Sequence, residues 1–328
     1  MRDESQRDLP TMSRRRALQI AASLAATAAA GEPLTQPARG AELDLKMLPL
    51  IDAHSHLWSP DVEKWPLANN QTKADLAPSS FTPEELWKVA EAEKVGRAVL
   101  IQHHLYHGWD NRYLIDCARR FPRRFVVTGM VDDTQPHPDK VMRDLLPQGV
   151  RAVRITPRIT PRIRGDEWLA GDGMAAMWRC GAETGQVMAC LIDAKDLAGV
   201  EAMCKRHPNT PVVIDHFARI GVDGEIRKAD LDALCALAKH KRAAVKISAY
   251  YALGKKQPPY DDLAPMIRRV LDAFGPERSM WASDSPYQVQ GEHTYAASIA
   301  LVRDRLDFLS AGDKEWLLSK TAERIFFA

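Results

Sequence analysis

The sequence predicts an α/β fold, a (β/α)8 barrel, from three observations. Eight short apolar runs recur from Leu48 onward, and segments with helical periodicity lie between them. The runs are continuously apolar rather than alternating, which is typical of parallel strands that are covered on both faces. The spacing of about 35 residues per unit suits a strand followed by a helix. An open, doubly wound parallel sheet is the alternative, because a count of strands does not show that the sheet closes.

The elements are expected in a regular order. The expected strands are PLIDAH (49–54), RAVLIQ (97–102), FVVTGMV (125–131), AVRIT (152–156), QVMACLI (186–192), PVVIDH (211–216), AAVKIS (243–248) and SMWASD (279–284). Helical periodicity marks 82–95, 110–121, 231–240 and 263–274. The first of these begins with Thr82 as a cap and Pro83 in the first turn. The tail from Asp313 to Ala328 is predicted as an extra C-terminal helix that packs against the barrel.

The composition excludes several classes of function. The chain is 45% hydrophobic and 27% charged with a net charge of +2, which is typical of a globular protein and argues against nucleic-acid binding. The five cysteines are scattered without a CxxC pair, so neither a disulfide framework nor cysteine chemistry is expected. None of the expected strands is followed by a glycine-rich phosphate loop, so nucleotide binding lacks its usual cradle.

The N-terminus reads as a targeting segment. Residues 1–30 combine Arg14, Arg15 and Arg16 with an alanine-rich apolar run that ends at Ala30, which resembles a twin-arginine (Tat) export signal. The run is shorter than the roughly 20 residues that span a bilayer, so no stable membrane anchor is expected after cleavage. We expect a linker at 31–46, the barrel at 47–328, the Tat export machinery as a partner, and a periplasmic or secreted protein. A disordered or helical N-terminus of a cytosolic protein is the alternative.

Polar residues gather at the predicted carboxyl ends of the strands, which share one face of a barrel. In strand 49–54 and just beyond it, His54 and His56 point to the same side and can share one divalent ion; the alternative is a pair of structural histidines. Asp284, at the end of the last strand, can bind a metal, take a proton from water, or cap the next segment. His216 is either a site residue or a histidine bonded to a neighbouring loop.

Candidate substrate-binding residues lie around the same face. Arg158 follows the fourth strand, where a guanidinium can bind a carboxylate through two hydrogen bonds, and Arg162 and Arg164 continue that loop. His103 follows the second strand, and Tyr250 and Tyr251 follow the seventh. Solvated loop charges are the alternative for the arginines.

The motifs IDAHSHLW, GVRAVRI, PVVIDH, VKIS, FGPERSMWASDSP and KTAERIF resemble the amidohydrolase-related branch (amidohydrolase family 2) of TIM-barrel metal-dependent hydrolases, closest to its lactonase subgroup. The resemblance implies a distorted barrel and hydrolysis or decarboxylation of small organic molecules. It assigns His54, His56, His216 and Asp284 to the metal-binding motifs. Many relatives also carry a ligating histidine or carboxylated lysine on a central strand, whereas MACLID offers none and Lys195 lies past its end. The resemblance therefore implies one divalent ion, zinc in the first instance, or no ion at all.

The hypothesis is a hydrolase that opens a lactone or cyclic ester of a small anionic organic molecule. Asp284 is the general base, and His216 acts with it at the reacting carbonyl. A metal-dependent decarboxylase of a small aromatic or unsaturated carboxylic acid is the second reading, and a non-catalytic periplasmic binding barrel is the third. The expected partner is a small-molecule substrate, and homo-oligomerisation is left open.

Overall fold

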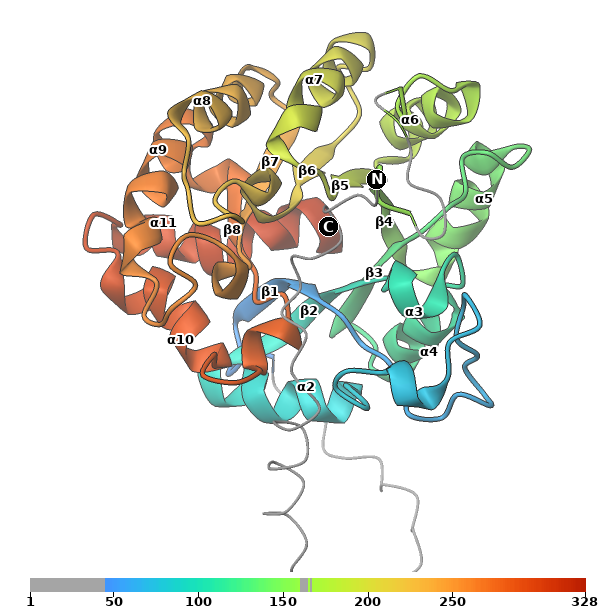
Figure 1. Cartoon of the computed structure of the whole chain (residues 1–328), viewed down its shortest axis with the longest axis horizontal. Helices are drawn as coiled ribbons and strands as arrows, with labels where there is room; N and C mark the ends of the chain where they lie inside the picture. The colour runs from blue at the N-terminus through green and yellow to red at the C-terminus, as the bar shows by residue number, and fades with distance from the viewer. Residues whose placement is uncertain (1–44, 160–164, 166) are drawn as a thin grey trace, which may run out of the picture. The chain divides into compact units, whose positions relative to one another are not determined.

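The fold is a parallel barrel of eight strands in the computed structural model, which describes residues 45–159, 165 and 167–328. The strands are β1 (Leu50–Ser55), β2 (Val95–Ile101), β3 (Phe125–Gly129), β4 (Val150–Ile155), β5 (Val187–Cys190), β6 (Val212–Ile214), β7 (Ala243–Ile247) and β8 (Ser279–Trp281). They pair in parallel in chain order from β1 to β8 (Figure 1). Beyond β8 the chain returns to β1, where a parallel bridge joins Ser55 to Ser285. The predicted barrel is confirmed, and the open sheet was the wrong alternative.

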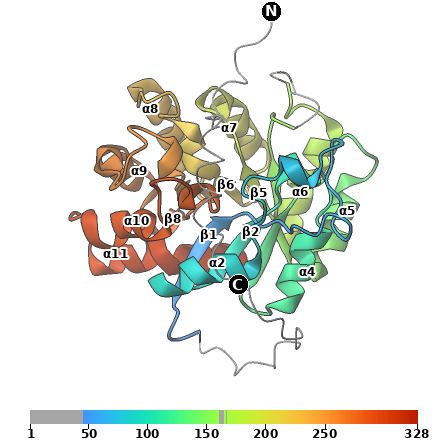
Figure 2. The same cartoon turned by 60° about the horizontal axis from the view of Figure 1, so that its bottom comes forward.

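Helices surround the strands in both views of the molecule (Figures 1 and 2). They are α2 (Pro83–Ala90), α3 (His104–His107), α4 (Arg112–Arg120), α5 (Pro138–Leu145), α6 (Asp172–Thr184), α7 (Leu197–Arg206), α8 (Lys228–Ala236), α9 (Ala264–Phe274), α10 (Tyr295–Ala300) and α11 (Ala311–Glu315). Thr82 caps α2 by accepting a hydrogen bond from the Glu85 amide, and Glu85 accepts one from the Thr82 amide. This capping box fixes the start of α2 where the sequence predicts it.

The barrel has an inner core that is separate from the layer between strands and helices. The inner core contains Ile51, Ala53, Val99, Ile101, Val126, Ala152, Val187, Val213, Ala244, Met280 and Ala282. Ala322 and Phe326 pack against these residues from the C-terminal segment. That segment continues α11 through two π-helical stretches, Trp316–Lys320 and Glu323–Phe327. The predicted C-terminal helix is therefore confirmed, and it closes the amino-terminal end of the barrel.

Seven of the eight strands end one to three residues earlier than the sequence suggests, and at β6 and β8 the difference matters for the site. β6 ends at Ile214 and β8 at Trp281, so His216 and Asp284 lie just beyond the ladder. Both residues have left-handed backbone conformations, with φ of 52° at His216 and 63° at Asp284. A non-glycine residue adopts this region at a cost in free energy, and such strain is concentrated at functional sites. The strand ends were mispredicted because apolar patterning does not register a change in backbone conformation.

The predicted export signal, and the linker except for its last two residues, lie outside the described residues and stay predictions. Within the described part of the chain, no helix is long and apolar enough to cross a membrane. All five cysteines are buried free thiols, in agreement with the expectation that the protein has no disulfide framework.

Candidate active site

Four side chains from the first, sixth and last strands meet at the carboxyl end of the barrel. The Nε2 atoms of His54 and His56 are 3.3 Å apart. The Oδ1 atom of Asp284 lies 3.3 Å from Nε2 of His54 and 3.4 Å from Nε2 of His56. The Oδ2 atom of Asp284 lies 3.7 Å from Nε2 of His216. All four residues are buried, so the sequence-predicted set comes together as one cluster.

The alternation of side chains along a strand shows which of them point into the barrel. Residues at i and i+2 of a strand share a face, so the position two residues after an inner-core residue also points inward. Lys246 lies within β7, two residues after Ala244 of the inner core, and therefore points inward, whereas Asp215 and Asp284 follow the ends of β6 and β8.

Strand β1 needs an irregularity to do the same. Its inner-core residues are Ile51 and Ala53, which would place Ser55 rather than His54 on the inner face. The pairing of β1 with β2 shifts register between Asp52 and Ser55. We infer that this bulge brings His54 inward.

Asp52 joins the strands that carry the site. Its Oδ1 atom accepts hydrogen bonds from the amides of His54 (3.0 Å) and Ser283 (2.9 Å). Its Oδ2 atom accepts from the hydroxyls of Ser283 (2.5 Å) and Tyr295 (3.0 Å). The Asp284 amide also donates to the His54 carbonyl at 2.9 Å. These bonds set the distance between the histidine pair and Asp284.

A divalent ion fits the cluster. His54, His216 and Asp284 can each offer one ligand atom, and these atoms lie within 4.8 Å of one another. Zinc binds histidine nitrogen at about 2.0–2.1 Å, so the corners of its coordination tetrahedron are roughly 3.3 Å apart. The separations among His54 Nε2, His56 Nε2 and Asp284 Oδ1 are 3.3, 3.3 and 3.4 Å, close to that edge. Three of the four candidate ligands therefore already stand at coordinating distances from one another.

The outer ring nitrogens support the same assignment. His56 Nδ1 donates a hydrogen bond to the Ile101 carbonyl at 2.9 Å. Because a carbonyl only accepts, a neutral His56 has its Nε2 lone pair free to face the cluster. His216 Nδ1 lies 2.8 Å from the Ser248 hydroxyl, which also leaves its Nε2 directed at Asp284.

A buried group of charges lies behind His54. Lys246 Nζ is 3.0 Å from Asp215 Oδ1 and 3.2 Å from His54 Nδ1. Arg154 lies 3.6 Å from the other Asp215 oxygen, and Asp215 Oδ1 is 3.5 Å from His54 Nδ1. Burial, together with the charge of Lys246, holds the pKa of His54 well below its usual value. His54 is therefore uncharged at neutral pH, the state that binds a metal.

Asp284 is suited to act as a base. Burial alone would raise the pKa of its carboxyl, but the neighbouring His216 and His54 more than offset this and hold it well below the usual value. The Tyr251 hydroxyl donates to Asp284 Oδ2 at 2.7 Å. Asp284 is thus ionised at neutral pH, with one oxygen facing His54 and His56 and the other facing His216 and Tyr251.

Of the four described residues that were predicted to bind substrate, Tyr251, His103 and Arg158 lie near the site and Tyr250 does not. Tyr251 contacts Asp284, and the His103 ring lies 5.0 Å from that of His56 while its Nε2 is 2.6 Å from the Tyr287 hydroxyl. Arg158 is partly exposed and pairs with Asp193. Tyr250 is fully buried and donates its hydroxyl to the Ile247 carbonyl at 2.8 Å, so the structure turns it into the core. Arg162 and Arg164 lie outside the described residues.

Sequence reasoning missed Lys246, Tyr287 and Asp52. Lys246 carried a readable signal, because a lysine inside the apolar run AAVKIS has to be buried on one face of its strand. Asp52 lies two residues before His54, but its position gave no sign that its carboxylate joins the first and last strands. Tyr287 lies in a loop with no pattern that indicates its direction.

Comparison with known proteins now gives these residues a context. The chain belongs to the amidohydrolase family, whose model matches residues 51–328. It is 27% identical to an L-fucono-1,5-lactonase of Burkholderia ambifaria over 72% of this chain and 80% of that protein. It is also 27% identical to a 4-sulfomuconolactone hydrolase of Rhizobium radiobacter over 72% of this chain and 75% of that protein.

Solved structures share the fold. An amidohydrolase of Burkholderia multivorans with bound zinc superimposes with a TM-score of 0.70 at 22% identity, over 85% of this chain and 99% of that one. A 5-carboxyvanillate decarboxylase of Sphingomonas paucimobilis is more distant, with a TM-score of 0.62 at 13% identity over 85% and 99% of the two chains. The family membership and the His–His–Asp cluster are together consistent with a metal-dependent enzyme.

Proposed function

We propose that this protein is a hydrolase that opens a lactone, or a similar cyclic ester, of a small anionic organic molecule. The observation that carries the proposal is the ionised Asp284 carboxylate, held within 3.7 Å of three imidazoles at the mouth of the barrel. A water molecule next to such a carboxylate can be deprotonated as it attacks a carbonyl. The two curated relatives described above are both named for lactone hydrolysis, which supports the same reaction.

The reaction follows from the positions of these groups. Asp284 accepts a proton from water while the water oxygen forms a bond to the lactone carbonyl carbon. The ring carbon–oxygen bond then breaks, and Asp284 returns the proton to the leaving alkoxide, so that the product is a hydroxy acid. A bound divalent ion would polarise the carbonyl and lower the pKa of the water. His216, 3.7 Å from Asp284, lies where it can orient the carboxylate and the carbonyl.

Zinc is the ion we propose, held by His54, His56, His216 and Asp284. Nitrogen and carboxylate ligands are typical of zinc, which can also expand to five ligands, so that water could bind beside these four. Arg158 and Arg219 lie on the same side of the barrel, where both pair with Asp193, and Arg154 pairs with Asp215. A substrate that carries a carboxylate or another anion could replace Asp193 as the partner of the exposed Arg158 guanidinium.

The test is a lactone panel with metal analysis. We expect wild-type protein to open at least one lactone, and chelator treatment to remove the ion and the activity together. Asp284→Asn should lower kcat at least about a thousandfold, because it removes the base while keeping the side-chain volume. Unchanged circular dichroism and thermal unfolding are the control for folding. Near-normal turnover by Asp284→Asn would refute the mechanism.

The decarboxylase reading has less support. Strand β5 ends at Cys190 without a ligating histidine, and the likeness to the decarboxylase extends to the fold alone. Release of carbon dioxide rather than a ring-opened acid would favour that reading. Tight ligand binding without turnover of any ester, lactone or acid would favour the binding-barrel reading.

We also propose that residues 1–30 direct export through the twin-arginine pathway. The support is the run of arginines followed by an apolar, alanine-rich segment. Replacement of Arg14, Arg15 and Arg16 with lysine should keep a tagged protein in the cytoplasm, whereas the unaltered chain should be recovered from the periplasm or the medium. An unchanged distribution would refute the proposal.

A further inference from the structure

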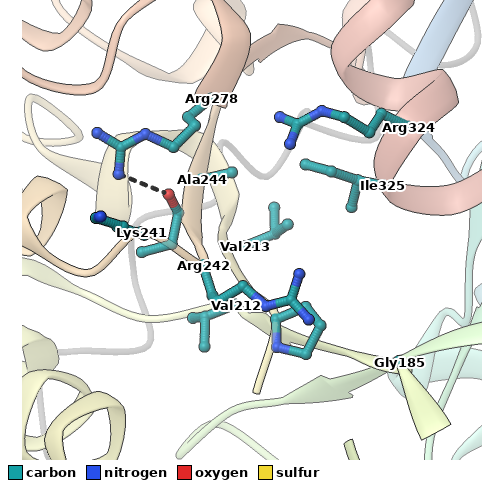
Figure 3. A pocket seen from close by; sticks show the side chains of 11 residues that line it. Gly185, Val212, Val213, Lys241, Arg242, Ala244, Arg278, Arg324 and Ile325 are labelled. Carbon is teal, nitrogen blue, oxygen red and sulfur yellow. Dashed lines mark hydrogen bonds between the residues drawn. The ribbon is translucent and has the colours of Figure 1, made fainter. Parts of the chain in front are cut away.

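A cavity lies at the amino-terminal end of the barrel, away from Asp284. It has a volume of about 230 Å³ and lies where β6 and β7 begin, next to the C-terminal segment (Figure 3). Its apolar lining includes Val212, Val213, Ala244 and Ile325. None of the residues that form the candidate active site lines it.

Four basic side chains line this cavity, which we call the floor cavity. They are Lys241, Arg242, Arg278 and Arg324, and Figure 3 shows the three guanidinium groups on different sides of the cavity. The described lining contains no aspartate or glutamate. The floor cavity therefore concentrates positive charge in a chain whose net charge is only +2.

The three arginines donate hydrogen bonds to main-chain carbonyls rather than to carboxylates. Arg278 donates to the main-chain carbonyls of Phe274 (3.0 Å), Ala238 (2.8 Å) and His240 (3.1 Å). Arg324 donates to the Glu277 carbonyl at 2.5 Å, and Arg242 donates to the Asn209 carbonyl at 3.3 Å. Carbonyl oxygens orient a guanidinium but carry no net charge to balance it.

Nearby basic residues behave differently. Lys239 pairs with Glu201, and Arg269 of α9 pairs with Asp232 of α8. Within the described part of the chain, the four side chains of the floor cavity form no such ion pair. Arg278 is only partly exposed; its burial and then the charge of Arg324 lower its pKa, and the charge of Glu277 offsets part of this. A bound anion would relieve this repulsion.

We propose that the floor cavity is a binding site for a small oxyanion, a phosphate or a carboxylate. Guanidinium groups bind both through paired hydrogen bonds, and fixed donors lose little entropy on binding. The apolar lining would accommodate the carbon body of an organic anion. The site is separate from Asp284, so it does not depend on the lactonase proposal.

The test uses the full chain. The three probes are inorganic phosphate, succinate and chloride, each at the same ionic strength. The free energy of stabilisation by a ligand rises with its concentration relative to Kd, so binding appears as an increase in Tm and as heat in calorimetry. We expect phosphate or succinate, but not chloride, to raise Tm. The stronger of the two identifies the class of anion.

The variant Lys241→Gln/Arg324→Gln removes two cations from the floor cavity and should weaken binding of the stronger anion at least tenfold. The matched control is Lys88→Gln/Arg206→Gln, which removes two exposed cations from α2 and α7. The control should bind like wild type. Equal binding by both double variants, equal stabilisation by chloride, or no binding at 20 mM anion would each overturn the proposal.

Discussion

Lys246→Met tests whether the buried charges behind His54 hold the candidate active site together. Lys246 and Asp215 have no solvent exposure, and their charged atoms are 3.0 Å apart. At an effective dielectric constant of about 20, two charges separated by 3.0 Å attract by about 5.5 kcal/mol. Methionine keeps the length of the side chain but leaves Asp215 without its nearest cation.

The expected loss of stability is smaller than this Coulomb energy. Arg154, 3.6 Å from Asp215, still provides part of the compensation. Removing one partner of a buried pair typically costs about 3–5 kcal/mol, and we expect the lower end of that range. The free energy of unfolding should therefore fall by about 3 kcal/mol in urea titration. Bound metal should also decrease, because His54 loses the contact that orients it.

A double-mutant cycle separates this interaction from general damage. Lys246→Met/Asp215→Asn should be more stable than the sum of the two single changes predicts, by at least about 1.5 kcal/mol. The matched control is Lys239→Met, which breaks an exposed pair with Glu201 and should cost less than about 1 kcal/mol. The reasoning is wrong if the coupling is zero within error, or if Lys246→Met costs no more than Lys239→Met.

Two further predictions concern single side chains. Tyr251→Phe removes the 2.7 Å hydrogen bond to Asp284, so kcat/KM should fall about tenfold and the acidic limb of the pH–rate profile should move to higher pH; an unchanged profile would contradict the contact. His104→Gln should make the protein more tolerant of acid. Burial, and then the charge of Arg154, lower the pKa of His104 from 6.5 to about 3. A depressed histidine pKa means that stability is lost as pH falls below the unfolded value of 6.5. Between pH 7 and pH 4.5 the variant should therefore gain up to about 3 kcal/mol relative to wild type in urea titrations, and parallel pH curves would refute the assignment.

The fold could be predicted from the sequence because the strands of a barrel leave a recognisable pattern of apolar residues. Each of the eight apolar runs contains a strand, since a parallel strand covered on both faces has to be apolar almost throughout. The capped start of α2 was equally readable from Thr82 and Pro83. The predicted strand ends were less accurate. His216 and Asp284 have left-handed backbone conformations, although their motifs suggest that the strand continues through them.

The sequence predicted which residues form the candidate site better than it predicted how they are arranged. His54, His56, His216 and Asp284 meet as expected, but the register shift in β1 that accompanies the inward turn of His54 has no sequence signature. Tyr250 and Tyr251 are neighbours with the same chemistry, and only the backbone decides that Tyr251 reaches Asp284. Lys246 was overlooked because a lysine is buried only where an acidic partner balances its charge. That partner, Asp215, follows a different strand, and the sequence alone does not show that the two residues meet.

The hydrogen bonds of Asp52 connect residues that are 231 positions apart in the chain. The histidine pair is therefore synthesised first and its carboxylate partner almost last, so the complete ligand set exists only once the end of the barrel is in place. Binding of an ion to that set would stabilise the seam between β1 and β8 by mass action. Bound metal would thus report that the seam between β1 and β8 has closed.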